Sequence, residues 1–300
     1  MFFVLFLVVG SRVFDPLTSA LTNFTEFRYF SIAGGRILSL MNEPEMKGER
    51  KSPEAGDIRF EHVSFAYQDK EVLHDITVTL PKNSLTALVG PSGSGKSTVM
   101  KLCARFYDPQ QGRIFFGDVP MDEIAPESLM SHISMVFQDV YLFQDTIRNN
   151  IRFGKTDATD EEIIAAAKKA CCHDFIMRLP QGYDTTVGEG GCTLSGGEKQ
   201  RISIARAMLK DAQVILLDEA TASLDPENEV EVQKAIDSLI KGRTVIAIAH
   251  RLKTIKDADR IIVLDNGRIK EEGTHDELVR KEGLYAHLWN IQESISGWKL

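Results

Sequence analysis

The architecture of this chain can be predicted from one segment, Gly90-Pro91-Ser92-Gly93-Ser94-Gly95-Lys96-Ser97-Thr98. It matches G-x-x-x-x-G-K-[ST], the loop whose backbone N–H groups surround the phosphates of a nucleotide. Glycines let successive N–H groups turn inward around an anion. Lys96 supplies a positive charge for the β- and γ-phosphates, and the Ser97 hydroxyl can reach a Mg²⁺ that bridges them. The motif therefore predicts a nucleotide-phosphate site at residues 90–98.

The residues on either side of this loop agree with that interpretation. The apolar run 85–89 reads as a buried strand, and residues 98–106 read as a helix, so a phosphate would lie at a helix N-terminus. An ordinary Gly/Ser turn is the alternative, and both flanks argue against it.

A second site follows the apolar run Val214-Ile215-Leu216-Leu217, which ends in Asp218-Glu219. A continuous apolar strand suits the centre of a parallel sheet that is buried on both faces. Acidic residues at the carboxyl end of such a strand emerge where open α/β sheets bind ligands. After a phosphate loop, Asp218 is expected to hold Mg²⁺ through water, and Glu219 to polarise an attacking water.

Between these sites lies Leu194-Ser195-Gly196-Gly197-Glu198-Lys199-Gln200-Arg201. Ser195-x-x-Glu198 is a capping box, which predicts a helix from Gly197 to Lys210. The two glycines exceed what a cap requires, and they leave the helix N-terminus bare. A phosphate could therefore meet the backbone N–H groups and the Ser195 hydroxyl there.

Together, the phosphate loop, the LSGGE segment and the acid-tipped strand resemble an ATP-binding cassette (ABC) ATPase over about residues 57 to 290. The resemblance implies an α/β fold, with a P-loop NTPase core, an antiparallel β subdomain and a helical subdomain. It also implies that Ser195, Gly196 and Gly197 bind the γ-phosphate of an ATP held by the opposite subunit. Two cassettes, identical or homologous, would then close head-to-tail around two ATPs.

Four further positions match the family one by one. Tyr67 resembles the aromatic residue that stacks on adenine, and Gln138 resembles the glutamine that reaches Mg²⁺ and the attacking water. Asp225 lies in a segment that resembles the loop crossing the dimer interface. His250 ends the apolar run 245–249 and resembles the histidine that contacts the γ-phosphate.

The resemblance thus assigns catalytic roles to Lys96, Gln138, Glu219 and His250, and Mg²⁺ contacts to Ser97, Gln138 and Asp218. The expected nucleotide contacts are Tyr67, Gly90, Pro91, Ser92, Gly93, Ser94, Gly95, Lys96, Ser97, Thr98, Ser195, Gly196, Gly197 and Asp225. ATP and Mg²⁺ are the expected cofactors.

Just before the LSGGE segment, Thr186-Val187-Gly188-Glu189-Gly190-Gly191 resembles a short loop of ABC exporters that contacts the membrane domain. The usual pattern has Glu before the Val and Arg after the second Glu, where this chain has Thr186 and Gly190. Three other classes of ABC ATPase fit less well. The exporter-like loop argues against an importer, and the short distance between the phosphate loop and the LSGGE segment leaves no room for the coiled coil of a DNA-repair ATPase. A translation factor would carry two cassettes, whereas this sequence contains one.

The N-terminal segment 2–9 is entirely apolar, but about 20 residues are needed to span a bilayer. A signal peptide is one interpretation, although a basic n-region and a small-residue cleavage site are absent. From Pro16 to Met41 the apolar residues continue with helical spacing. Residues 1–41 therefore resemble the last transmembrane helix of an ABC exporter and its cytoplasmic extension. Residues 42–56, a polar run with two prolines, predict a linker.

The predicted nucleotide-binding domain is 57–294, with a helical subdomain at about 139–210. We expect strands near 58–65 and 76–80 in its antiparallel part, and near 85–89, 133–137, 214–217 and 245–249 in its parallel core. Thr159-x-x-Glu162 predicts a second helix cap, Asn266-Gly267 predicts a hairpin turn, and two C-terminal helices are expected near 276–281 and 285–294.

We expect a truncated half-transporter: the ATP-hydrolysing subunit of an exporter, with its cassette on the cytoplasmic side of the cell membrane. A stand-alone cytosolic ATPase that docks on a separate permease is the alternative. The transported substrate is not specified by these motifs.

Composition supports a nucleotide enzyme without a nucleic-acid partner. The net charge is −8 and the pI is about 5.5, which excludes a broad basic footprint. The cysteines, Cys103, Cys171, Cys172 and Cys192, have no metal-ligand spacing. They are expected to be reduced thiols of a cytosolic domain.

Overall fold

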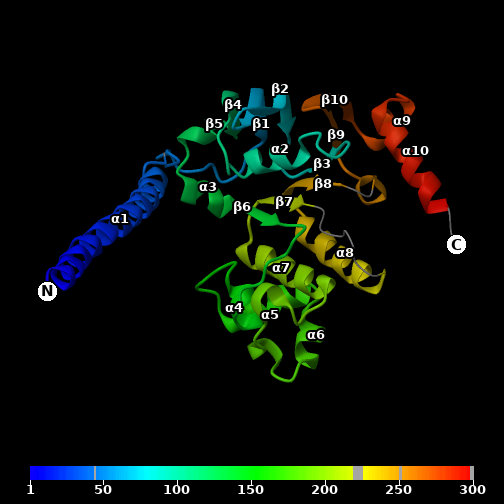
Figure 1. Cartoon of the computed structure of the whole chain (residues 1–300). Helices are drawn as coiled ribbons and strands as arrows, with labels where there is room; N and C mark the ends of the chain where they lie inside the picture. Colours follow the sequence, from blue (N-terminus) through cyan, green and yellow to red (C-terminus); the bar gives the residue numbers. More distant parts are fainter. Residues whose placement is uncertain (44, 219–225, 250–251, 298–300) are drawn as a thin grey trace. The chain divides into compact units, whose positions relative to one another are not determined.

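The computed structural model describes residues 1–43, 45–218, 226–249 and 252–297, which form two units divided between Met46 and Lys47 (Figure 1). Within its described residues, the first unit contains one helix, α1 (Phe2–Met41), of 40 residues. Pro16 lies inside α1, and the helix continues on both sides of it. Among the described residues, α1 is long and apolar enough to cross a membrane by length and composition, a criterion that an N-terminal signal sequence also meets.

The second unit is built on a six-stranded sheet with the strand order β10-β9-β3-β8-β7-β6. Its strands are β3 (Leu85–Val89), β6 (Ile133–Val136), β7 (Val214–Asp218), β8 (Thr244–Ile248), β9 (Arg260–Asp265) and β10 (Arg268–Gly273). All neighbours pair in parallel except β9 and β10, which form an antiparallel hairpin. The predicted parallel core and the predicted Asn266-Gly267 turn of the hairpin are confirmed.

A four-stranded antiparallel sheet, with the order β2-β1-β4-β5, covers one face of this core. Its strands are β1 (Ile58–Tyr67), β2 (Lys70–Leu80), β4 (Gln111–Phe116) and β5 (Val119–Pro120). The helix α2 (Lys96–Cys103) lies between the two sheets, because Met100 and Leu102 share a buried cluster with Phe60 of β1 and Ile246 of β8. Strands β4 and β5 were not predicted, since Gln111–Phe116 begins with polar residues and a glycine.

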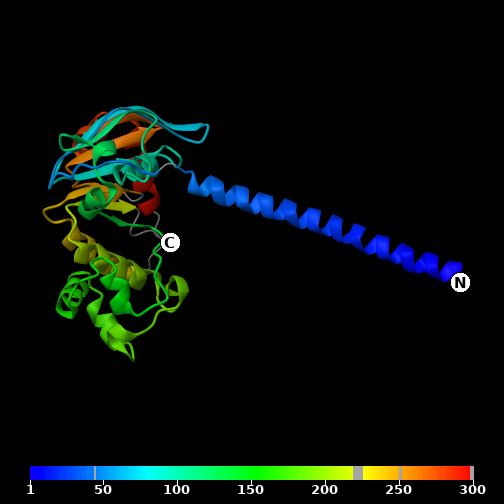
Figure 2. The same cartoon turned by 90° about the vertical axis from the view of Figure 1, so that its left-hand side faces the viewer.

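The other face of the parallel sheet is covered by helices. These are α4 (Ile147–Arg152), α5 (Asp160–Lys169), α6 (His173–Arg178), α7 (Gly196–Lys210) and α8 (Pro226–Ile240). Their apolar residues form one cluster with Ile215 and Leu217 of β7. Figure 2 shows the green and yellow helices on the side of the sheet away from the antiparallel strands.

Two short helices and one of 14 residues complete the described part of this unit. The segment α3 (Pro126–His132) leads into β6, while α9 (His275–Arg280) and α10 (Leu284–Gly297) follow the hairpin as predicted. Single 3-10 turns occur at η1 (Met121–Glu123), η2 (Gly182–Asp184), η3 (Glu189–Gly191) and η4 (Leu252–Ile255). Tyr285 of α10 is fully buried against the outer part of the sheet, so the C-terminal helices belong to the core.

Candidate ATP site

The phosphate loop joins β3 to α2 with a backbone that requires glycine. Gly90, Gly93 and Gly95 have φ values of 149°, 77° and 104°, in a region that side chains disfavour. A Cβ at Gly90 would also collide with the carbonyl oxygen of Leu264, and one at Gly95 would lie 2.6 Å from Leu73 Cδ2. The space beside Gly93 is open, since nothing lies within 4 Å of a Cβ built there.

Lys96 and Ser94 place unusual polar groups in this loop. The Lys96 side chain is buried at 7% exposure, and its ammonium donates to the carbonyl oxygens of Gly90 (2.8 Å) and Pro91 (2.9 Å). The hydroxyl of Ser94 is buried and has no hydrogen-bond partner in the described structure. A buried ammonium inside a glycine-rich loop, next to a buried hydroxyl without a hydrogen-bond partner, is suited to binding a phosphate. Ser97, at the first turn of α2, is exposed and can reach a metal ion held by that phosphate.

The other predicted residues of the ATP site follow the carboxyl ends of neighbouring strands. Asp218 is the last residue of β7, and Gln138 lies two residues beyond β6, where it is exposed. Because β3, β8, β7 and β6 are adjacent and parallel, these residues emerge at the same edge as the phosphate loop. Glu219, Asp225 and His250 lie outside the described residues.

No group of three or more His, Cys, Asp or Glu side chains in the described ranges could hold a metal ion. Mg²⁺ commonly keeps its waters and binds through one or two carboxylates plus substrate phosphates. Ser97, Gln138 and Asp218 fit a Mg²⁺ of this kind better than they fit a metal held by protein ligands alone.

Tyr67 is the last residue of β1 and belongs to a cluster of aromatic side chains beside α2. Its ring packs edge-on against Phe65 (4.9 Å between centroids) and Tyr107 (5.3 Å). The ammonium of Lys101, on α2, lies 5.7 Å from the centre of the Tyr67 ring. The ring is therefore fixed next to the helix that carries Lys96. Tyr107, which sequence reasoning did not single out, supports it.

Ser195 caps α7 as predicted. Its N–H donates to the Glu198 carboxylate (2.8 Å), and its hydroxyl accepts from the Glu198 N–H (3.3 Å). The hydroxyl uses a lone pair in this contact, so its proton can still donate to a ligand. Gly196 is exposed. Gly197 has a packing role, since a Cβ there would lie 2.6 Å from Asn228 Cβ on α8.

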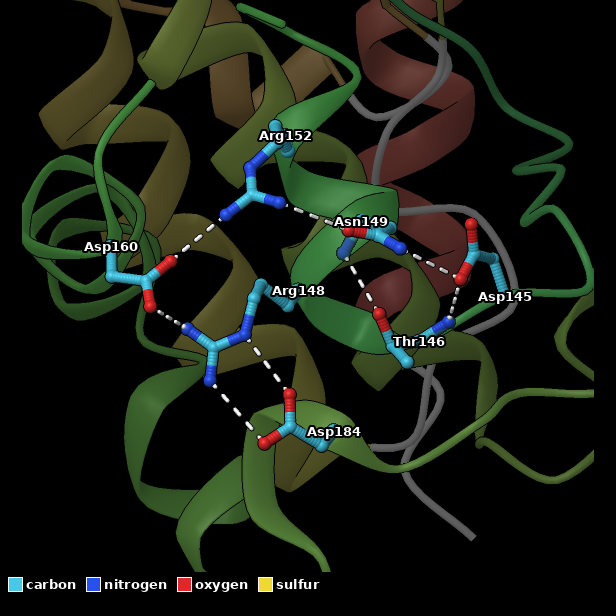
Figure 3. A network of polar contacts seen from close by, with 7 residues as sticks. All are labelled: Asp145, Thr146, Arg148, Asn149, Arg152, Asp160 and Asp184. Atoms are coloured by element: carbon cyan, nitrogen blue, oxygen red, sulfur yellow. Dashed lines mark hydrogen bonds and ion pairs between the residues drawn. The ribbon is translucent and has the colours of Figure 1, made fainter. Parts of the chain in front are cut away.

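The loop 186–191 is held against the segment that follows Gln138. Residues Thr146 and Thr186 form an antiparallel bridge, in which Val187 N–H donates to the Asp145 carbonyl (3.0 Å). Arg148 extends this contact through ion pairs with Asp160 (2.7 Å) and Asp184 (3.0 Å), which Figure 3 shows. The hydrogen bond that Arg148 donates to Asp184 raises the pKa of Arg148, so the guanidinium stays charged.

Side chains of α7 also reach the strand and segment around Gln138. Gln200 donates to the Phe137 carbonyl (3.3 Å), Arg206 to the Tyr141 carbonyl (2.9 Å), and Lys210 to the Ile133 carbonyl (2.7 Å). Burial lowers the pKa of Arg206 to about 10. The helix that begins at the LSGGE segment is thus hydrogen-bonded to the segment that contains Gln138. These contacts were not predicted from the sequence. The one pattern that could have indicated them is the presence of polar residues on a helix that is otherwise buried.

Cys192 offers a chemical test of the LSGGE segment. It is exposed three residues before Ser195, whereas burial raises the pKa of Cys172 to about 12 and raises that of Cys103 further. At pH 8 those two thiols stay protonated and covered, and burial also raises the pKa of the partly buried Cys171. An alkylating reagent should therefore modify Cys192 first. We expect complete alkylation of Cys192 to block ATPase activity by obstructing closure over this segment, and Cys192→Ser to be resistant. Unchanged activity after full modification, measured by mass spectrometry and phosphate release, would contradict this.

Known proteins are similar to this chain in sequence and in fold. The family model described as "ABC transporter" matches residues 73–222. The ATP-dependent lipid A-core flippase of Legionella pneumophila (strain Paris) is 51% identical over 239 residues, covering 79% of this chain and 41% of the relative. The putative multidrug export ATP-binding/permease protein YgaD of Bacillus subtilis (strain 168) is 52% identical over 239 residues, with the same two coverages.

A solved structure is similar as well. It is described as a bacterial Atm1-family ABC exporter with ATP bound, and it is 43% identical with a TM-score of 0.81. The match covers 88% of this chain and 47% of that one. The chain therefore spans about two fifths to one half of the length of the exporters that it matches.

Proposed function

Because this chain belongs to the ABC transporter family, we propose that it is the ATP-hydrolysing subunit of an ABC exporter. Two copies would close head-to-tail around two ATPs and couple hydrolysis to export of a substrate across the cell membrane. The observation that carries this proposal is the phosphate loop 90–98, with the Lys96 ammonium buried inside a glycine cradle. The cassette would face the cytoplasm, where ATP is supplied.

The loop residues would bind and orient the triphosphate. Lys96 now bonds two carbonyls of its own loop, so it is already placed where a β- or γ-phosphate oxygen would replace them. Ser97, Gln138 and Asp218 would hold Mg²⁺, which neutralises phosphate charge when bound. Tyr67 would stack on the adenine, since a π-face holds a base without reading its edges.

Hydrolysis needs a water in line with the γ-phosphate and donors around the developing charge. We assign the water to Gln138, Glu219 and His250, with Glu219 as the base. Ser195, Gly196 and Gly197 of the opposite subunit would close over the γ-phosphate, with Asp225 at the interface. The exposed Ser195 and Gly196 at the start of α7 support this role, because the N–H groups at a helix N-terminus attract anions. ATP would favour the closed dimer, since it touches both subunits only in that state.

An exporter is favoured over a cassette that docks on a separate permease. The relatives are described as a flippase and a multidrug export protein, and α1 is long and apolar enough to enter a membrane. We therefore assign residues 1–41 to the last transmembrane helix and its extension, 42–56 to a connecting segment, and 57–294 to the cassette with its helical subdomain at about 139–210. The loop 186–191 would contact the membrane domain through exposed Glu189.

The test is steady-state ATPase activity of the full chain in detergent with Mg²⁺, measured against protein concentration. Activity per chain should rise with concentration and then level off, because each active site needs two chains. A rate strictly proportional to concentration, down to concentrations at which light scattering shows monomers, would mean that each chain hydrolyses ATP alone.

A further inference from the structure

Arg105 is a buried cation that the proposed ATP chemistry does not use. It follows α2 and is 3% exposed. Its guanidinium donates to the carbonyls of Ile124 (2.6 Å), Lys47 (2.6 Å) and Asp122 (3.3 Å), and it pairs with Asp108 at 2.9 Å. A buried charge is costly unless its donors are satisfied, and here the planar fork binds three separate parts of the chain.

The backbone of Arg105 is also unusual. Its φ is +51°, a left-handed conformation that a side chain disfavours. Arg105 N–H donates to Leu102 and Phe106 N–H donates to Lys101, which is the bonding pattern of a helix end that normally has glycine. A non-glycine residue keeps such a conformation when its surroundings hold it there. The hydrogen bonds and the ion pair of the guanidinium keep Arg105 in this conformation.

The segment that Arg105 reaches, residues 47–53, is called the strap here. Glu49 and Arg50 N–H donate to the Glu123 carbonyl (3.1 and 2.9 Å), and Ala125 N–H donates back to the Arg50 carbonyl (2.8 Å). Gly48 has a φ of +145°, and a Cβ there would collide with the Ile124 carbonyl. The strap is therefore fixed to the cassette by a close backbone contact as well as by Arg105.

We propose that Arg105 is a positioning residue that ties the strap to the phosphate-loop helix α2, so that nucleotide binding at residues 90–98 is transmitted to the strap. The helix α2 has the phosphate loop at one end and Arg105 just beyond the other. The strap follows α1 in the chain, so this contact links the ATP site to the segment that leads from the proposed membrane helix. The nucleotide half of the proposal rests on the proposed function, whereas the contact itself does not.

The experiment is amide hydrogen exchange on the full chain in detergent, without nucleotide and with MgATP. Arg105→Asn removes the guanidinium and tolerates the left-handed backbone. Arg178→Asn is the matched control, because it removes the same charge from an exposed side chain at the end of α6. Without nucleotide, we expect the strap amides of Arg105→Asn to exchange about tenfold faster than in wild type, since losing buried hydrogen bonds eases local opening. Arg178→Asn should match wild type.

With MgATP, exchange should slow in both α2 and the strap of wild type. In Arg105→Asn it should slow in α2 only. Gly48→Ala keeps the Arg105 side chain but forces the strap away from the Ile124 carbonyl, which also accepts from Arg105. It should show the same separation, and it tests the proposal if Arg105→Asn does not fold. A strap that still responds to MgATP in both variants, or that exchanges as slowly as wild type without nucleotide, overturns the proposal. If exchange in α2 of wild type does not respond to MgATP, the proposed nucleotide site is wrong, and so is the transmission of nucleotide binding to the strap. The comparison of wild type with Arg105→Asn without nucleotide still tests whether Arg105 holds the strap.

Discussion

Lys96→Met is expected to reduce ATP affinity about 10- to 100-fold and to reduce hydrolysis to about 1% of wild type or less, because a hydrogen-bonded charge on the phosphates is lost. Methionine has a similar length and no charge. The Lys96 ammonium is held by two carbonyls of its own loop, so the change removes a cation that is already positioned. Binding of a fluorescent ATP analogue and phosphate release measure the two effects.

The matched control is Lys82→Met, which removes the same charge from an exposed position after β2. It should leave both quantities within about twofold of wild type, because exposed charges contribute little. Thermal melting should be similar for wild type and both variants. Wild-type turnover in Lys96→Met would remove the phosphate loop from the proposed mechanism.

Ser195→Asp is expected to reduce hydrolysis about 100-fold or more while leaving ATP binding to the phosphate loop nearly unchanged. Aspartate is as good a helix cap as serine, so the box with Glu198 and the start of α7 should persist. Its carboxylate, however, would face the γ-phosphate of the opposite subunit and repel it. The predicted signature is a fall in kcat without a fall in nucleotide affinity.

Thr159→Asp is the control for this change. Thr159 caps α5 in a second capping box with Glu162, so the same exchange tests the cap away from the ATP site. Circular dichroism and thermal melting should be unchanged in both variants. Loss of activity in Thr159→Asp as well would mean that the Ser195 effect is one of folding, and normal activity in Ser195→Asp would remove the LSGGE segment from catalysis.

The parts of the fold that depend on short-range patterns could be predicted from the sequence. The capping boxes at Thr159 and Ser195 and the Asn266-Gly267 turn have local causes, so their residues specify them directly. The parallel strands were visible as apolar runs that end near polar site residues. Membership of the ABC transporter family and the α/β architecture followed from the same segments.

The differences arise where distant residues decide the local structure. The helix after the phosphate loop was expected to reach Phe106, but α2 ends at Cys103 because Arg105 turns left-handed toward the strap. Residues 47–53 read as part of a polar linker, yet their backbone bonds to the Glu123–Ala125 segment and to Arg105. No local sequence pattern predicts a contact between residues this far apart in the sequence. The strand β2 likewise begins at Lys70, before its apolar residues, because it pairs with β1 over its length.

The central claim is that each ATP site is shared by two chains, and mixing two inactive variants tests it most directly. A dimer of one Lys96→Met chain and one Ser195→Asp chain would contain one site with both defects and one with neither. We predict that equal amounts, mixed and allowed to exchange subunits, recover about a quarter of wild-type ATPase activity, since half of the dimers are mixed and each has one intact site. Activity no greater than that of the two variants measured separately would contradict sites shared between copies of this chain.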